Sequence, residues 1–204
     1  MAAYDAVLFD FDGVLLDTEP IHWACWSEVL APLGVNLTWE FYSASCIGID
    51  DRDMLRMMAT RSDPPRDWRE LWELYPAKKA LFRSRTAGKP PFHAGLAPAL
   101  DALRPRYQLA VVSSSSCSEV EPLLVSGGIR EYFATVVGGE TVEHLKPHPE
   151  PYLLAAARLG AKSPLVLEDS PAGQAAGRAA GFEVLAIGHP SEVPVLLRSL
   201  IDRT

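Results

Sequence analysis

Five short, mostly apolar runs constrain the fold of this chain more than any other feature of its sequence. Each run ends in a polar residue or a glycine. Runs of this length are typical of strands that are buried on both faces of a parallel sheet. The runs cover residues 6–9, 108–112, 134–137, 164–167 and 183–187.

Helix signals lie between these runs from about residue 95 onward. Ser118 and Glu121 have the spacing of a capping box, and Pro171 directly after Ser170 marks a second helix start. Gly181 stands where that second helix should end. Alternating strands and helices predict an α/β fold, with a doubly wound, Rossmann-like parallel sheet covered by helices on both faces.

The segment between the first two runs has a different character. Residues 19–33, 51–60 and 67–85 read as helices, and no strand pattern separates them. We therefore predict an all-helical cap domain at residues 16–90, inserted into a core formed by residues 1–15 and 91–204, with a proline-containing linker at residues 88–91. All five tryptophans fall in this insert, and we expect most of them to form its hydrophobic core: Trp23, Trp26, Trp39, Trp68 and Trp72.

Composition excludes several classes of partner. The chain has 19 Lys and Arg against 26 Asp and Glu, a formal charge of -7, and no basic tract that could follow a nucleic-acid backbone. No apolar run approaches the roughly 20 residues that span a membrane. Three widely spaced cysteines suggest neither a disulfide framework nor a zinc site, so we expect a cytoplasmic protein. Nothing in the sequence predicts its oligomeric state.

Polar side chains capable of chemistry follow the ends of the predicted strands. Ligands of open α/β sheets bind at this edge, beyond the carboxyl ends of the strands. Each residue alone has an ordinary explanation, such as a turn aspartate, a helix-capping serine or a solvated loop lysine. Together they predict a site that binds an anion and a metal. The set comprises Asp10, Asp12, Ser113, Ser114, Lys146, Glu168 and Asp169.

Four short motifs among these residues resemble those of the haloacid dehalogenase superfamily. They are residues 10–14, 112–113, 146–147 and 167–173, and their order and spacing match along the whole chain. The helical insert directly after the first motif resembles the cap of the branch that includes beta-phosphoglucomutase and many sugar-phosphate phosphatases.

The resemblance implies a two-step phosphoryl transfer. Asp10 would attack phosphorus and form an aspartyl-phosphate, which splits one difficult displacement into two easier ones. Asp12 would protonate the leaving alkoxide and later deprotonate the attacking water. The expected substrate is a small phosphorylated metabolite, especially a sugar phosphate.

The remaining motif residues would hold the metal and the phosphate. Asp10, the backbone carbonyl of Asp12, and Asp169 would bind Mg²⁺, with Glu168 as a direct or water-mediated ligand. Because the clustered carboxylates repel one another, we expect Mg²⁺ to stabilise the fold as well as the reaction. Phosphate oxygens would be bound by Ser113, Ser114 and Lys146.

Two other functions within the family stay open, a mutase and a catalytically idle binder. Candidate cap or substrate residues are Asp17, Thr18, His22 and Arg52. The mutases need positive charge in the cap loop to hold a second phosphate, whereas residues 47–52 carry only Arg52, one residue out of register. Neighbouring Asp50 and Asp51 would repel a bisphosphate. We therefore favour a hydrolase.

A function from another class is a phosphorylation switch that resembles receiver domains. Receivers place the acceptor aspartate on a middle strand and have no large helical insert, which argues against this alternative.

The four histidines outside the insert show no recognisable pattern of partners: His93, His144, His148 and His189.

Overall fold

The computed structural model describes residues 4–47, 49–88 and 90–202. It divides into two compact units, Met1–Asp17 with Gly88–Thr204, which we call the core unit, and Thr18–Ala87, which we call the helical unit. Gly48 of the predicted cap loop and Lys89 of the predicted linker lie outside the described residues.

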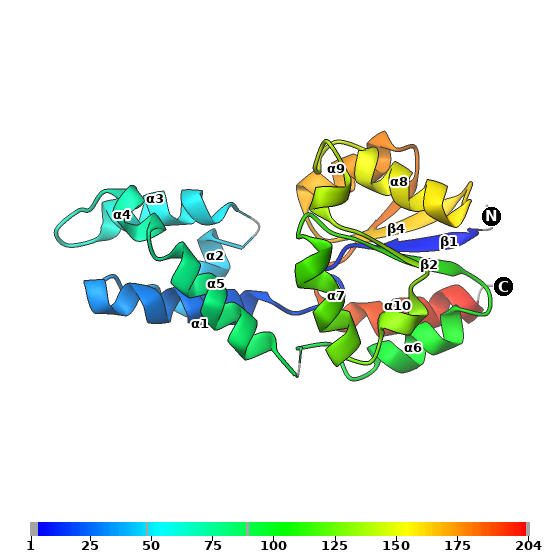
Figure 1. The fold of residues 1–204 in the computed structure, drawn as a ribbon, viewed down its shortest axis with the longest axis horizontal. Helices are drawn as coiled ribbons and strands as arrows, with labels where there is room; N and C mark the ends of the chain where they lie inside the picture. Colours follow the sequence, from blue (N-terminus) through cyan, green and yellow to red (C-terminus); the bar gives the residue numbers. More distant parts are fainter. Residues whose placement is uncertain (1–3, 48, 89, 203–204) are drawn as a thin grey trace. The chain divides into compact units, whose positions relative to one another are not determined.

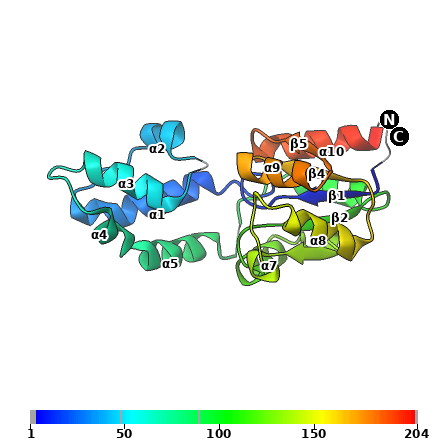
Figure 2. The same cartoon turned by 90° about the horizontal axis from the view of Figure 1, so that it is seen from above.

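The described part of the core unit contains a parallel five-stranded sheet, in the order β3-β2-β1-β4-β5. The sheet confirms the predicted α/β fold, and Figure 2 shows β5, β4, β1 and β2 following one another across it. Phe9 pairs with both Val111 and Leu167, so the first, second and fourth strands end at the same edge. The strands are β1 (Ala6–Phe9), β2 (Gln108–Val112), β3 (Thr135–Val137), β4 (Pro164–Glu168) and β5 (Glu183–Ala186).

Alternate residues of the strands face two different helix layers. Val7 and Phe9 pack into one cluster with α6, α7 and α10, whereas Ala6 and Leu8 pack into another with α8 and α9. Figure 1 shows α8 and α9 on the opposite side of the sheet from α6 and α10. Both faces of β1 are therefore buried, as its continuous apolar run requires. The helices are α6 (Leu96–Leu103), α7 (Cys117–Ser126), α8 (Glu150–Leu159), α9 (Pro171–Ala179) and α10 (Val193–Asp202).

The predicted capping box at α7 is in the wrong frame. Ser116, not Ser118, is the N-cap residue, and its partner is Glu119 rather than Glu121. Glu140 Oε1 accepts the N–H of Cys117 at 2.8 Å, so the helix can begin earlier than we predicted. The predicted start of α9 is confirmed, because the Ser170 side chain accepts the N–H of Gly173.

The helical unit contains more breaks than the sequence predicts. The predicted helix 67–85 is two helices, because Pro76 begins α5 well but could not continue α4. Residues 31–33 form a 3₁₀ turn after α1, and α2 was not predicted. The helices are α1 (Glu19–Leu30), α2 (Trp39–Ser45), α3 (Asp51–Arg61), α4 (Trp68–Trp72) and α5 (Tyr75–Thr86).

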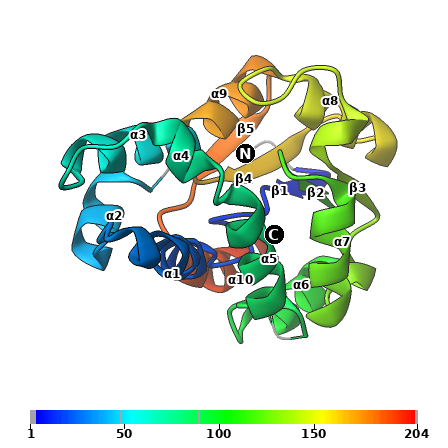
Figure 3. The ribbon, with the colours of Figure 1, turned by 60° about the vertical axis from the view of Figure 1, so that its left-hand side comes forward.

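Aromatic residues form much of the core of the helical unit, as predicted. Trp26 is fully buried and packs with Leu30, Leu55 and Leu71. The other four tryptophans are partly buried against the same cluster. Figure 3 shows α3 and α4, which contribute to it, lying beside each other.

The three cysteines are free thiols: Cys25, Cys46 and Cys117. Among the described residues, every helix is too short or too polar to cross a membrane.

Candidate active site

The backbone at the ends of the strands places the predicted site residues at one edge of the sheet. The N–H of Asp10, just past β1, donates to the carbonyl of Leu167 at 2.9 Å. The N–H of Ser113, just past β2, donates to the carbonyl of Val137, also at 2.9 Å. These bonds extend the sheet by one residue and fix where Asp10 and Ser113 lie; both residues are buried.

Lys146 reaches this edge from the loop between β3 and α8. Its ammonium group donates to Asp10 Oδ1, to Glu168 Oε1 at 3.0 Å and to the carbonyl of Val112 at 3.1 Å. The lysine side chain is only 5% exposed, so water can do little to neutralise its charge. Burial alone would lower the pKa of Lys146, but the charges of Asp10 and Glu168 raise it overall. The site therefore contains a permanent buried cation.

Glu168 has partners on both carboxylate oxygens. While Oε1 faces Lys146, Oε2 accepts the N–H of Ser170 at 3.1 Å and its hydroxyl at 2.9 Å. Gly173 makes this arrangement possible, because a Cβ at that position would lie 2.0 Å from the Glu168 carboxyl carbon. Burial, followed by the charge of Asp10, raises the pKa of Glu168 to about 7.

Three carboxylates lie close enough to hold one cation. Asp10, Glu168 and Asp169 each offer an oxygen, and these atoms lie within 4.8 Å of one another. Burial, followed by the charge of Asp10, raises the pKa of Asp169 to about 6. Burial and then repulsion thus disfavour the charged carboxylates, a divalent cation would offset both effects, and an oxygen-only donor set suits a hard ion. These residues therefore fit Mg²⁺.

The predicted phosphate-binding serines have different surroundings. Ser113 Oγ accepts the N–H of Ser115 at 3.0 Å, which leaves its hydroxyl proton available to a bound anion. Ser114 is exposed. Asp12 is half-buried, and its backbone forms an isolated bridge with Leu16 in the turn after β1.

The candidate cap residues lie in separate places. Asp17 belongs to the core unit, where its Oδ2 lies 3.5 Å from His189 Nε2. The other three belong to the helical unit. Thr18 precedes α1, and the His22 ring stacks on Phe82 with ring centres 4.3 Å apart.

Arg52 is exposed and lies over the Trp72 ring, with its guanidinium carbon 4.8 Å from the ring centre. Next to it, Asp51 accepts hydrogen bonds from Lys78 Nζ at 3.0 Å and from Trp26 Nε1 at 2.8 Å. Lys78 thus offsets part of the negative charge that we expected to repel a second phosphate.

Sequence reasoning missed two neighbours of the cluster. Tyr152 on α8 lies below Lys146, with the ammonium nitrogen 5.0 Å from the ring centre. Its apolar spacing with Ala155 and Leu159 marks a core residue and gives no sign of a charged neighbour. Ser170 was predicted as a helix start, but no sequence signal indicates its bonds to Glu168.

Comparison with known proteins relates this arrangement to one family. A model of the family described as haloacid dehalogenase-like hydrolase matches residues 7–187. The fructose-1-phosphate phosphatase YqaB of Escherichia coli is 30% identical over 198 residues, which cover 90% of this chain and 96% of that protein. The phosphorylated carbohydrates phosphatase of Thermotoga maritima is 30% identical over 185 residues, 88% of this chain and 82% of that protein.

A similar solved structure is that of a hydrolase from Deinococcus radiodurans with bound phosphate and sodium. It superimposes with a TM-score of 0.75 at 31% identity, over 98% of this chain and 89% of that one. The likeness therefore extends over the sheet and the helical unit alike.

Proposed function

Since the chain belongs to the haloacid dehalogenase-like hydrolase family and is a phosphoric monoester hydrolase, we propose that it acts through a phosphorylated Asp10 on a small metabolite. The observation that carries this proposal is the buried contact of Lys146 with Asp10 and Glu168 at the strand edge. Such a cation lowers the repulsion between the Asp10 carboxylate and an incoming phosphate.

The proposed chemical steps give the two aspartates different roles. Asp10 Oδ attacks phosphorus while the bond to the leaving oxygen breaks, and Asp12 gives that oxygen its proton. Asp12 is then a carboxylate and removes a proton from the water that attacks the aspartyl-phosphate. Inorganic phosphate leaves, and Asp10 and Asp12 return to their starting states. Proton transfer by a positioned carboxyl group contributes about 10²–10⁴-fold to such rates.

The surrounding residues bind the charge that spreads over the phosphoryl oxygens. Lys146 and the Ser113 hydroxyl would donate to these oxygens, and Ser114 would add a donor from the same loop. Mg²⁺ held by Asp10, Asp169 and the Asp12 carbonyl, with Glu168 directly or through water, would neutralise the phosphoryl charge.

The class of substrate is inferred from the relatives. Two phosphatases that are 30% identical have names that specify fructose 1-phosphate and phosphorylated carbohydrates. We therefore propose a sugar phosphate or a similar small phosphomonoester, and we keep a cytoplasmic setting as part of the proposal.

The experiment measures phosphate release from a panel of phosphomonoesters, with and without Mg²⁺. We expect metal-dependent release by wild type and none by Asp10→Asn. Asp101→Asn is the matched control, since Asp101 is an exposed aspartate of the same unit, and it should retain wild-type rates.

The intermediate is tested with Asp12→Asn and a substrate whose leaving group needs no proton. Phosphoryl transfer to Asp10 should then outpace hydrolysis, and intact-protein mass spectrometry should detect the phosphorylated chain. If the variant still released phosphate from the substrate while the mass of the protein stayed unchanged, the covalent step would be refuted. Conversion of glucose 1-phosphate to glucose 6-phosphate with a bisphosphate primer, without net release, would instead identify a mutase. Binding without turnover of any compound would identify an idle binder.

A further inference from the structure

A second group of possible metal ligands lies in the loop that leads from β3 into α8. His144, His148 and Glu150 each offer one ligand atom, and these atoms lie within 4.8 Å of one another. Glu150 Oε2 is 3.0 Å from His144 Nδ1 and 3.8 Å from His148 Nδ1. The group is separate from the three carboxylates at the strand edge, and it differs from them in offering two nitrogen donors.

The distances suit a tetrahedral ion. With bonds of about 2.0–2.1 Å to imidazole nitrogen and carboxylate oxygen, neighbouring ligands of a tetrahedral Zn²⁺ lie about 3.3 Å apart. The two distances from Glu150 Oε2 lie on either side of that value. The two imidazole rings are 4.5 Å apart between centres and tilted by 32°.

Backbone hydrogen bonds already hold the carboxylate in place. Glu150 Oε1 accepts the N–H of Glu143 at 2.8 Å, and Oε2 accepts the N–H of His144 at 3.0 Å. These bonds, the largest cause being that from Glu143, lower the pKa of Glu150. The residue is therefore an oriented, ionised ligand before any ion arrives.

One histidine already has a suitable tautomer. His148 Nδ1 accepts the N–H of Glu150 at 3.3 Å, which requires the tautomer that carries its proton on Nε2, and an ion at Nδ1 would replace this long hydrogen bond. That tautomer is the one a metal needs at Nδ1. At His144, the tautomer that carries its proton on Nε2 would offer Nδ1 to an ion beside Glu150 Oε2.

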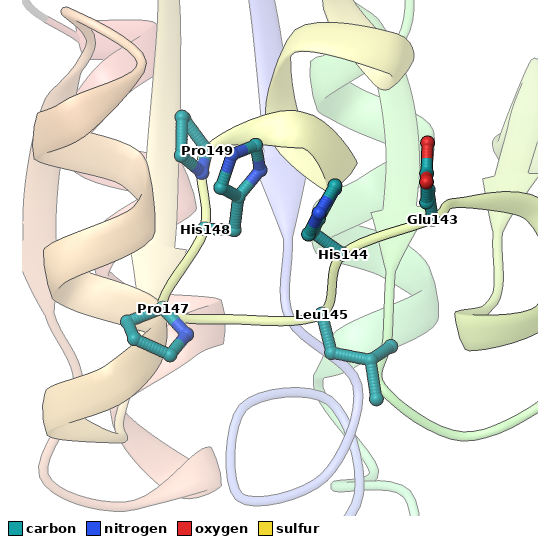
Figure 4. Close-up of a pocket in the computed structure, with 6 residues that line it drawn as sticks. All are labelled: Glu143, His144, Leu145, Pro147, His148 and Pro149. Carbon is teal, nitrogen blue, oxygen red and sulfur yellow. The ribbon is translucent and has the colours of Figure 1, made fainter.

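Figure 4 shows the rings of His144 and His148 on the same side of the loop, with Leu145 pointing the other way. His144 and His148 line a hollow, and all three candidate ligands are partly exposed, so a dissolved ion can reach them. The residues that line the hollow are Glu143, His144, Leu145, Pro147, His148 and Pro149.

We propose that His144, His148 and Glu150 bind a transition-metal dication of the Zn²⁺ type, with water in the fourth position. Imidazole donors favour Zn²⁺, Cu²⁺ and Ni²⁺ over Mg²⁺, so this site and the carboxylate cluster select different ions. Lys146 lies in the loop between the two histidines. A bound ion would therefore link the residues on either side of Lys146, the lysine that contacts Asp10 and Glu168.

The test titrates metal-free protein with Zn²⁺ by calorimetry in the Asp169→Asn background, which removes one ligand of the carboxylate cluster. We expect one Zn²⁺ per chain in that background. Adding His144→Ala or His148→Ala should weaken binding by more than the roughly 10–100-fold that a lost second-shell partner costs. His93→Ala, which removes an exposed histidine elsewhere in the core unit, should leave it unchanged.

A spectroscopic measurement keeps the proposal testable should a variant unfold. Cu²⁺ bound to the protein in the Asp169→Asn background should show nitrogen hyperfine structure in its electron paramagnetic resonance spectrum. That structure should weaken in Glu150→Gln and disappear when both histidines are replaced. Unchanged Zn²⁺ binding in the histidine variants, or a Cu²⁺ spectrum with only oxygen ligands, would overturn the assignment.

Discussion

Lys146 Nζ lies 3.0 Å from Glu168 Oε1, although 22 residues and the whole of α8 separate the two in the chain. The same ammonium group donates to Asp10, which stands 136 residues earlier. One buried cation thus lies between two buried carboxylates, and the three charges offset one another. Replacing any one of them should affect both stability and phosphoryl transfer.

Lys146→Met should abolish phosphate release and destabilise the core unit. Methionine fills similar space but leaves Asp10 and Glu168 facing each other without a cation. Breaking a buried ion pair by removing one partner costs about 3–5 kcal/mol. The rate of phosphate release and the free energy of urea unfolding are the measurements.

Lys162→Met is the matched control for this change, since Lys162 is an exposed lysine of the same unit. It should leave both quantities near their wild-type values. Wild-type stability in Lys146→Met would show that the contacts of Lys146 with the two carboxylates are not energetically coupled to the fold.

Asp169→Asn should stabilise the protein in chelator at neutral pH. The folded-state pKa of Asp169, about 6, lies above the ordinary 3.8, so the folded chain binds more protons than the unfolded chain between these values. The contribution of Asp169 to stability therefore declines as the pH rises from about 4 to about 6, by at most about 3 kcal/mol. The measurement is the difference in unfolding free energy between wild type and variant across this range. It should grow with pH and then level off.

In the presence of Mg²⁺, wild type should become more stable than Asp169→Asn. At pH 8 we expect a rise in the melting temperature of wild type, because an ion that binds only the folded state stabilises it by about 2.7 kcal/mol at 100 times its Kd. Asp169→Asn should respond weakly or not at all. An equal rise in both proteins would place the stabilising ion elsewhere.

Much of the sheet was predictable because its central strands β1 and β4 are buried on both faces, and such strands must be continuously apolar. The five runs match β1 to β5 closely, but the edge strand β5 is largely exposed and not buried as its run predicts. The short helix α2 was missed because a helix of seven residues has little intrinsic stability. It depends on tertiary contacts such as the packing of Trp39 on Trp23, which lies 5.5 Å away between ring centres.

Most of the site was predictable because motif and strand end coincide, and Lys146 was predicted from its motif alone. Asp10, Ser113 and Glu168 each follow or end a strand, so the parallel topology alone brings them to one edge. The ring of Tyr152 below Lys146, and the approach of His144 to Glu150, depend on the path of the loop between β3 and α8. No residue pattern specified that path, although the spacing of two histidines four residues apart, followed by a glutamate, was visible.

His22→Phe should make the helical unit less sensitive to acid. Burial, followed by the charge of Lys78, lowers the pKa of His22 from 6.5 to about 3, so the folded chain binds fewer protons than the unfolded chain between these values. The stability that neutral His22 contributes is complete above pH 6.5 and is lost as the pH falls toward 3.

Phenylalanine keeps the stacking on Phe82 and cannot be protonated. Between pH 7 and pH 5, wild type should lose up to about 2 kcal/mol more than the variant. Tryptophan fluorescence during urea unfolding is a suitable measurement, since all five tryptophans belong to this unit. Parallel stability curves for the two proteins would contradict the assigned shift, and His93→Phe provides a control in the core unit.

Gly13→Ala should damage the site more than its backbone conformation alone explains. Gly13 has φ of 76°, in the left-handed region, where a side chain costs about 1–2 kcal/mol. A Cβ there would also lie 2.0 Å from Asp169 Oδ2, so the carboxylate would have to move. Gly181→Ala is the matched control, because Gly181 has φ of 81° and open space around its Cβ position.

Both variants should lose stability in urea unfolding, but Gly13→Ala should lose more and should also lose its stabilisation by Mg²⁺. Equal losses in the two variants, with the Mg²⁺ response intact, would show that Asp169 does not need the space left by Gly13.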